Sequence, residues 1–133
     1  MTPLSKKFTK AYARELLKVA EGDLRTAEVL MKHPGGRPEN LFFHIQQAVE
    51  KAIKAALCHR GLPVPLTHDL GALMAMLPEG VPLPPNSKAL LPLTEFASIR
   101  RYEEGKYEYT PEETASAYRC GEGALDWARR LVG

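Results

Sequence analysis

A row of polar side chains between residues 44 and 54 has the residue types and the spacing of a ligand-binding face. It consists of His44, Gln47, Lys51 and Lys54. At 100° per residue these four side chains fall within about 80° of one another on a helix, and Cys58 continues the row. An ammonium group offers a point charge to phosphate, and an amide both donates to and accepts from a base or a sugar. The row therefore predicts either a nucleotide- or RNA-binding face or the solvated side of an amphipathic helix.

Two carboxylates on the predicted helices are expected to form ion pairs. Asp23 projects from the apolar side of an earlier helical segment, between Ala20 and Ala27. Because buried charges are normally paired, we expect Asp23 to form a structural salt bridge with another helix rather than to bind a ligand. Glu50 lies just beside the row, and an i,i+4 ion pair between Glu50 and Lys54 would restrain that lysine.

Further candidates for the same site lie later in the chain. His68 is expected to open a short helix, where the helix dipole disfavours a charged imidazole and leaves a neutral ring able to accept a proton. The alternative for His68 is a capping role. Arg100 and Arg101 have guanidinium groups that bind phosphate in bidentate fashion, and the Tyr102 ring is able to stack on a base. If these three residues converge on the row, a binding face is expected; otherwise they form a solvated connection between helices.

Other kinds of site are not indicated. No histidine has the i,i+4 spacing to a second histidine or to a carboxylate pair that an HExxH site needs, so we predict no metal site and no cofactor. No Walker or GxGxxG phosphate loop is present. The chain has 18 Lys+Arg and 16 Asp+Glu, a net charge of +2. That balance is too even to indicate nucleic-acid binding by bulk charge alone.

The elements that must position these residues are helices. Pro and Gly gather at 34–38, 61–65, 78–85 and 105–111, and the segments between them have helical periodicity. Helices are predicted at Ser5–Lys32, Pro38–His59, His68–Leu77, Pro85 or Asn86 to Arg101, and Pro111 to about Val132. Thr67 is the expected N-cap of the third helix, and Pro92 predicts a kink or a late start in the fourth. Thr110 and Glu113 predict a capping box at the start of the last.

The whole chain, residues 1–133, is predicted to be a single all-α domain, an antiparallel bundle of about five helices. Hydrophobic content of 44% and charged content of 26% fit an ordinary globular protein. We see no apolar run of signal-peptide length and no stretch able to span a bilayer, so we expect a cytoplasmic protein without a membrane contact.

Four sequence stretches, taken in order, are typical of one known family. They are Ala20-x-x-Asp23-Leu24-x-x-Ala27, Phe43-His44-x-Gln46-Gln47-Ala48-x-Glu50-Lys51-x-x-Lys54-Ala55, Thr67-His68-Asp69-Leu70 and Arg101-Tyr102. This order resembles the HEPN domain (higher eukaryotes and prokaryotes nucleotide-binding domain) over nearly the whole chain. The resemblance implies a prokaryotic bundle of about five helices that forms a homodimer. It also implies a partnership with a small nucleotidyltransferase, in a system of toxin–antitoxin type.

The resemblance bears on catalysis as well. Many HEPN proteins are metal-independent ribonucleases whose motif is an arginine followed, after four to six residues, by a histidine. Arg100 and Arg101 occupy the position of that arginine, but residues 105–108 are Gly-Lys-Tyr-Glu and include no histidine. The sequence therefore favours a binding module over an enzyme. The alternatives are a divergent ribonuclease in which Arg101 acts with His44 or His68, and a structural subunit that binds no ligand.

Overall fold

The computed structural model describes residues 6–33, 35–98 and 108–133, with the backbone alone for residues 6–9. Its three long helices are α1 (Lys6–Lys32), α2 (Pro38–His59) and α5 (Pro111–Val132). Between α2 and α5 the chain forms α3 (Leu70–Ala75), α4 (Ser87–Leu90) and the 3₁₀ helix η1 (Leu91–Ala97). These described residues contain no β-strand, which confirms the predicted all-α class. None of the described helices is both long and apolar enough to cross a bilayer.

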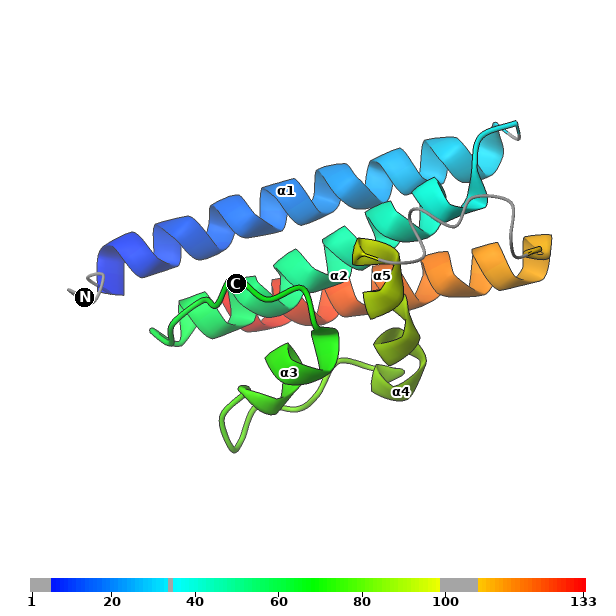
Figure 1. Cartoon of the computed structure of the whole chain (residues 1–133). Helices are drawn as coiled ribbons and strands as arrows, with labels where there is room; N and C mark the ends of the chain where they lie inside the picture. Colours follow the sequence, from blue (N-terminus) through cyan, green and yellow to red (C-terminus); the bar gives the residue numbers. More distant parts are fainter. Residues whose placement is uncertain (1–5, 34, 99–107) are drawn as a thin grey trace.

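The three long helices lie side by side, and the short elements pack against one flank of α2 (Figure 1). α1 runs antiparallel to α2, and α5 runs in the same direction as α2 (Figure 1). The short helices make this possible, because they carry the chain back along the bundle before α5 begins. α2 is therefore the central helix, in contact with α1, α3, α5 and η1.

The central position of α2 changes what its sequence pattern means. Its expected apolar face is buried as predicted, for example at Ile45, Val49 and Ile53, each 0% exposed. The side that could have been a solvated face is largely covered too: Lys54 is 8% exposed and Cys58 only 1%. Burial raises the pKa of the Cys58 thiol. Cys58 continues the polar row on a helical wheel, but its thiol is buried, because neighbours on several sides enclose this end of the helix.

The predicted third helix, His68–Leu77, extends beyond α3 at both ends, since α3 spans only Leu70–Ala75. α3 starts at Leu70, and its N-cap is Asp69, whose side chain accepts a hydrogen bond from the Ala72 N–H at 3.2 Å. Thr67, the expected N-cap, instead accepts from the Asp69 N–H at 3.1 Å. Both side chains suit a helix start, and Asp69 holds the position three residues before its donor. His68 consequently lies before the helix, so neither the proposed capping role nor the helix-dipole argument applies to it.

The predicted fourth helix is divided into two short elements. Asn86 precedes α4 with φ of 57°, a left-handed conformation that asparagine tolerates. Pro92 lies within the first two residues of η1, where a missing N–H costs no helical bond. The interruption expected at Pro92 is therefore confirmed as a change from α to 3₁₀ geometry. At α5 the predicted start is also confirmed, since Thr110 and Glu113 form both hydrogen bonds of a capping box.

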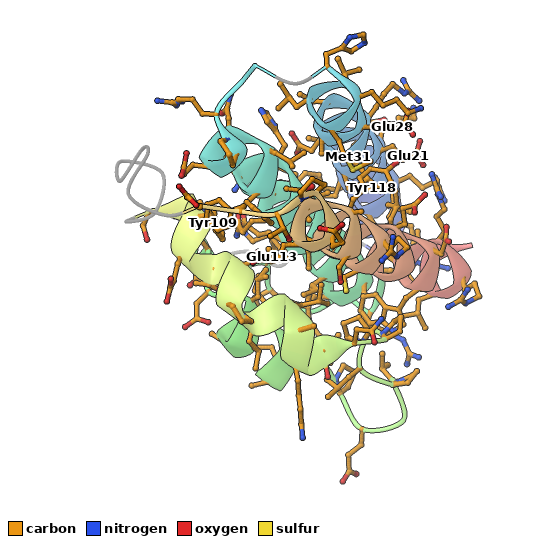
Figure 2. The ribbon with its side chains drawn as sticks, turned by 90° about the vertical axis from the view of Figure 1, so that its right-hand side faces the viewer. Glu21, Glu28, Met31, Tyr109, Glu113 and Tyr118 are labelled. Carbon is orange, nitrogen blue, oxygen red and sulfur yellow. The ribbon has the colours of Figure 1, made fainter. Side chains whose placement is uncertain are left out.

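A hydrogen bond from Tyr118 to Glu28 joins α5 to α1, where Figure 2 shows the two side chains together. Burial of the Tyr118 hydroxyl, its bond to Glu28 and the negative charges of Glu122 and Glu28 raise the pKa of Tyr118 to about 12. The fold thus favours the neutral phenol. This contribution to stability is complete below the ordinary pKa of 10.0 and is lost as the pH rises towards 12.

We therefore expect Tyr118 to ionise late in an alkaline titration followed by tyrosinate absorbance. Tyr118→Phe should remove that late component and leave the earlier ones in place. Tyr12, which is 42% exposed, provides the matched control through Tyr12→Phe. Loss of an early component in Tyr118→Phe would contradict the assignment.

Candidate functional site

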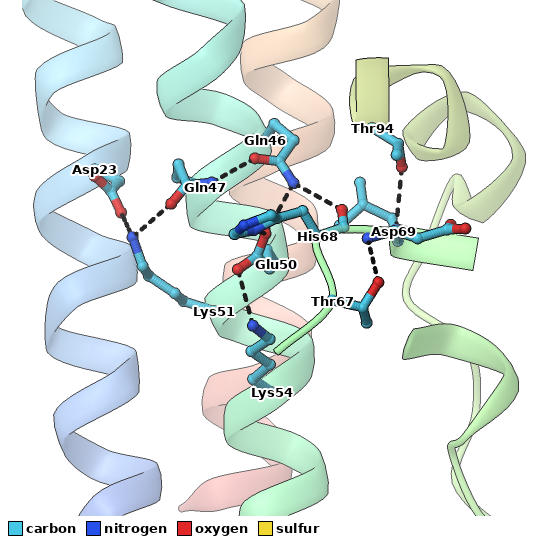
Figure 3. Close-up of polar contacts among 11 residues, drawn as sticks. Asp23, Gln46, Gln47, Glu50, Lys51, Lys54, Thr67, His68, Asp69 and Thr94 are labelled. Carbon is cyan, nitrogen blue, oxygen red and sulfur yellow. Dashed lines mark hydrogen bonds and ion pairs between the residues drawn. The ribbon is translucent and has the colours of Figure 1, made fainter. Parts of the chain in front are cut away.

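Three residues of the polar row, Gln47, Lys51 and Lys54, belong to a continuous hydrogen-bond network on α2 (Figure 3). Lys51 Nζ donates to Asp23 Oδ2 at 2.7 Å and to Gln47 Oε1 at 3.1 Å. Gln47 in turn donates from Nε2 to Gln46 Oε1 at 2.7 Å. The salt bridge expected for Asp23 is therefore present, and it ties the middle of α1 to α2.

The second half of the network surrounds Glu50, whose side chain is 4% exposed. Its carboxylate accepts from Gln46 Nε2 at 3.1 Å and from Lys54 Nζ at 3.0 Å, and lies 2.8 Å from His68 Nδ1. Gln46 also donates to the backbone carbonyl of His68 at 3.1 Å. Glu50 and Gln46 together fix the segment before α3 against the central helix.

The surroundings of Glu50 set its charge. Burial alone would raise the pKa of this carboxyl, but the hydrogen bonds from Gln46, His68 and Lys54 and the positive charge of Lys54 lower the pKa below 4.5. A carboxyl with a lowered pKa stabilises the fold above its ordinary pKa, and this contribution disappears as the pH falls through the folded value. Glu50 is thus an anion at neutral pH.

We expect the protonation of Glu50 to lower the stability of the protein in acid. The free energy of unfolding of the wild type should fall as the pH drops below 4.5, partly because Glu50 gains a proton. Glu50→Gln has no proton to gain at this position, so it should lose less of its own stability over the same pH range. Urea unfolding between pH 7 and pH 3 measures both. Equal losses in the two proteins would show that Glu50 does not contribute.

His68 is the most accessible member of the network, with a side chain that is 61% exposed. Because Nδ1 faces the Glu50 carboxylate, Nε2 is the ring nitrogen that remains for a ligand. A neutral ring with its proton on Nδ1 presents Nε2 as an acceptor. The sequence predicted the residue, and the structure adds that a buried carboxylate orients its ring.

His44 lies beside the Asp23 end of the network. Its Nδ1 is 3.5 Å from Asp23 Oδ1, and the side chain is 25% exposed. Among the described residues Nδ1 has no hydrogen-bond partner, and the Phe43 ring meets the imidazole edge-on at a centroid distance of 5.3 Å. His44, Gln47 and Lys51 thus share one partly exposed surface between α1 and α2.

The charges within the network balance. Asp23 neutralises Lys51, and Glu50 neutralises Lys54, as the i,i+4 spacing predicted. Lys54 is also nearly covered, with a side chain that is 11% exposed. The two carboxylates and the two ammonium groups of the network therefore cancel, and together they do not attract a phosphate dianion.

Three further candidates, Arg100, Arg101 and Tyr102, lie outside the described residues, and their convergence on the row stays a prediction. Within the part of the chain that the structure describes, no group of three or more potential metal ligands is found. Ligand binding by the network residues likewise stays a prediction.

Sequence reasoning missed the importance of Gln46, which is 0% exposed and bonds to Gln47, Glu50 and the His68 carbonyl. The sequence contained a signal for Gln46. An amide between the buried positions Ile45 and Val49 needs polar partners, and Glu50 lies four residues after it. Glu39 was missed as well. It is 1% exposed near the start of α2, where the helix dipole favours a carboxylate, and neither oxygen has a hydrogen-bond partner among the described residues.

Comparisons with known proteins agree with this architecture. The sequence matches the model of the HEPN domain family over residues 13–131. A crystal structure of TT1696 from Thermus thermophilus is similar, with 28% identity, a TM-score of 0.76, and 90% of this chain and 97% of that chain covered. A crystal structure of ST0689, described as an archaeal HEPN homologue, has 24% identity, a TM-score of 0.69, and coverage of 91% and 98%. No curated protein matches the sequence.

Proposed function

Because this chain belongs to the HEPN domain family, we propose that it is a nucleotide- or RNA-binding subunit. The proposed binding face contains His44, Gln47, Lys51 and His68, with Arg100, Arg101 and Tyr102 as further contacts. Lys54 serves this face indirectly, by holding the carboxylate that orients His68. The observation that carries the proposal is the exposed His68 ring, fixed through Nδ1 by the buried Glu50 so that Nε2 is left for a ligand.

The hydrogen-bonding capacity that remains on this face supports the proposal. Lys51 uses two donated bonds, to Asp23 and Gln47, and an ammonium has three donors. The Gln47 amide nitrogen donates one N–H to Gln46 Oε1, and its second N–H is left for a ligand. The face therefore offers donors from Lys51 and Gln47 and an acceptor at His68 Nε2, and Asp23 neutralises the charge of Lys51. Such a set suits the edge of a base or a sugar hydroxyl better than it suits phosphate.

Calorimetric titration tests this proposal. The protein is titrated with ATP, with the other ribonucleoside triphosphates and with short single-stranded RNA, and the same titrations are repeated on His68→Ala. We expect His68→Ala to weaken binding at least about tenfold, roughly 1.4 kcal/mol. His33→Ala, at an exposed position in the α1–α2 connection, should bind like the wild type. A folded wild type that binds none of these ligands would refute the nucleotide- and RNA-binding function.

The HEPN family also supports a proposal about assembly. In this proposal the chain is a cytoplasmic, prokaryotic homodimer that acts with a small nucleotidyltransferase in a system of toxin–antitoxin type. Co-expression with the adjacent reading frame, followed by light scattering on the purified complex, tests both points. A monomeric protein that does not co-purify with an adjacent nucleotidyltransferase would contradict them.

One observation favours a second candidate, a divergent metal-independent ribonuclease. The Glu50–His68 pair has the form of a general base oriented by a carboxylate, with Nε2 available to take the proton of a ribose 2′-OH. Arg101 is the proposed cation for the scissile phosphate. Incubation of RNA with the purified protein in EDTA distinguishes the two candidates. Cleavage that both His68→Ala and Arg101→Ala abolish would establish the enzyme, and intact RNA would exclude it.

A further inference from the structure

A second surface carries the positive charge that the network lacks. Lys10 and Arg14 lie one turn apart near the start of α1, and Arg60 directly follows α2. Since α1 and α2 are antiparallel, these two ends lie together (Figure 1). We call Lys10, Arg14 and Arg60 the cationic end, and we propose that it binds the phosphodiester backbone of single-stranded RNA.

The first support is the absence of neutralising partners. All three side chains are exposed, and none of them forms an ion pair with another described residue. Several cations elsewhere on the long helices are paired. Lys18 meets Glu15, and Arg129 meets both Glu21 and Asp126.

The second support comes from His59, the last residue of α2. Burial lowers the pKa of its imidazole, and the positive charges of Lys10, Arg60 and Arg14 lower that pKa further. The three cations that lower this pKa therefore lie near His59, two of them on α1 and one directly after α2. Its Nδ1 has no hydrogen-bond partner in the described parts of the chain. A local excess of positive charge exists here although the whole chain carries only +2.

The third support is complementarity with the binding face. That face offers donors and an acceptor without net charge, whereas an RNA chain also brings one negative charge per nucleotide. His59 lies eight residues beyond Lys51, about 12 Å along the axis of α2 at 1.5 Å per residue. A mononucleotide is too short to use both surfaces fully, but an oligonucleotide spans this distance. The choice of RNA as the ligand rests on the proposed function, and the charge cluster itself does not.

The experiment measures anisotropy of a fluorescein-labelled 20-nucleotide single-stranded RNA between 50 and 300 mM NaCl. The test variant is Lys10→Glu/Arg60→Glu, which reverses one cation on each side of the cluster. The control is Lys88→Glu/Arg119→Glu, which reverses two exposed cations of α4 and α5 that have no described ion pair. Both variants change the net charge by the same amount, from +2 to −2, since each reversal subtracts two. Circular dichroism melting confirms that each variant is folded.

We expect the test variant to bind at least about tenfold more weakly at 100 mM NaCl and the control to bind within about threefold of the wild type. For single strands each phosphate contact contributes about −0.7 to the slope of log affinity against log salt, so losing two contacts should reduce the slope by about 1.4. Equal weakening in both variants would mean that bulk charge acts, and would overturn the proposal.

Two other results would also overturn it. If the wild type binds ATP but not the RNA, the cationic end is not an RNA surface, and nucleotide binding by the network survives. If the test variant keeps full RNA affinity but loses the wild type's co-sedimentation with vesicles of 30% phosphatidylserine, the surface binds anionic lipid instead. Failure of the proposed function is recognised separately, by a folded wild type that binds neither the ribonucleoside triphosphates nor RNA in the calorimetric titration.

Discussion

Glu50→Ala is expected to lower the free energy of unfolding by about 3–5 kcal/mol, because it leaves a buried cation without its partner. Lys54 is 8% exposed, and Glu50 is the carboxylate to which it donates. The same substitution removes one of the two acceptors of Gln46 Nε2 and the partner of His68 Nδ1. Urea unfolding followed by circular dichroism measures the change.

A double-mutant cycle separates the ion pair from the rest of the network. Glu50→Ala/Lys54→Met should be less destabilised than the sum of the two single variants, by about 1–3 kcal/mol, because no unpaired charge remains buried. Glu15→Ala breaks an exposed pair with Lys18 and should change stability by less than about 1 kcal/mol. If Glu50→Ala behaved like Glu15→Ala, the buried network would not hold the segment before α3.

Gly121→Leu is expected to destabilise the fold by about 3 kcal/mol, because three helices approach closely at this residue. A Cβ atom on Gly121 of α5 would lie 3.1 Å from Leu24 Cδ1 of α1 and 3.1 Å from Ile45 Cγ2 of α2. Leu24 is 6% exposed and Ile45 is 0% exposed, so neither side chain is able to swing out to solvent. Thermal and urea unfolding measure the loss.

The matched control for Gly121→Leu is Gly22→Leu on α1. A Cβ at Gly22 has no heavy atom within 4 Å, and the residue is exposed. Leucine has the higher helix propensity, so Gly22→Leu should gain stability by up to about 1 kcal/mol. Two glycine-to-leucine changes in helices of the same bundle should thus have opposite signs. Stabilisation by Gly121→Leu would mean that α1, α2 and α5 do not meet as closely as the structure shows.

The elements that the sequence predicted well are those with a local chemical signal. The start of α5 is an example, since Thr110, Pro111 and Glu113 form a capping box within four residues. The boundaries of α2 are another, because prolines and glycines flank it. The start of the third helix was predicted wrongly because the local signal there is ambiguous. Thr67 and Asp69 are both good N-caps, and only the surrounding packing selects Asp69.

The candidate site was predicted by residue type but not by environment. A helical wheel describes one helix, and it correctly grouped His44, Gln47 and Lys51. It carries no information on how many neighbours surround that helix, so it left the polar side of α2 as a solvated or ligand-binding face. The structure encloses Lys54 and Gln46 there and pairs both lysines with carboxylates. Asp23 was the exception, because a carboxylate on an apolar stripe already requires a partner.

Buried and exposed residues of the network have different roles. Glu50, Gln46 and Lys54 are structural, since they hold the α2–α3 connection and orient His68. The residues that reach the surface are the ones available to a ligand. This division explains why a Glu50 variant should lose stability, while a His68 variant should lose binding and remain folded.

The most direct test of the proposed binding face observes the histidine rings themselves. A long-range ¹H–¹⁵N correlation spectrum of uniformly ¹⁵N-labelled protein resolves both ring nitrogens of each of the four histidines. On addition of a nucleotide or RNA shown to bind by calorimetry, we predict a shift of several ppm at His68 Nε2, a smaller shift at His44 and none at His33. If saturating ligand moves neither His68 nor His44, the ligand binds elsewhere and the proposed face is wrong.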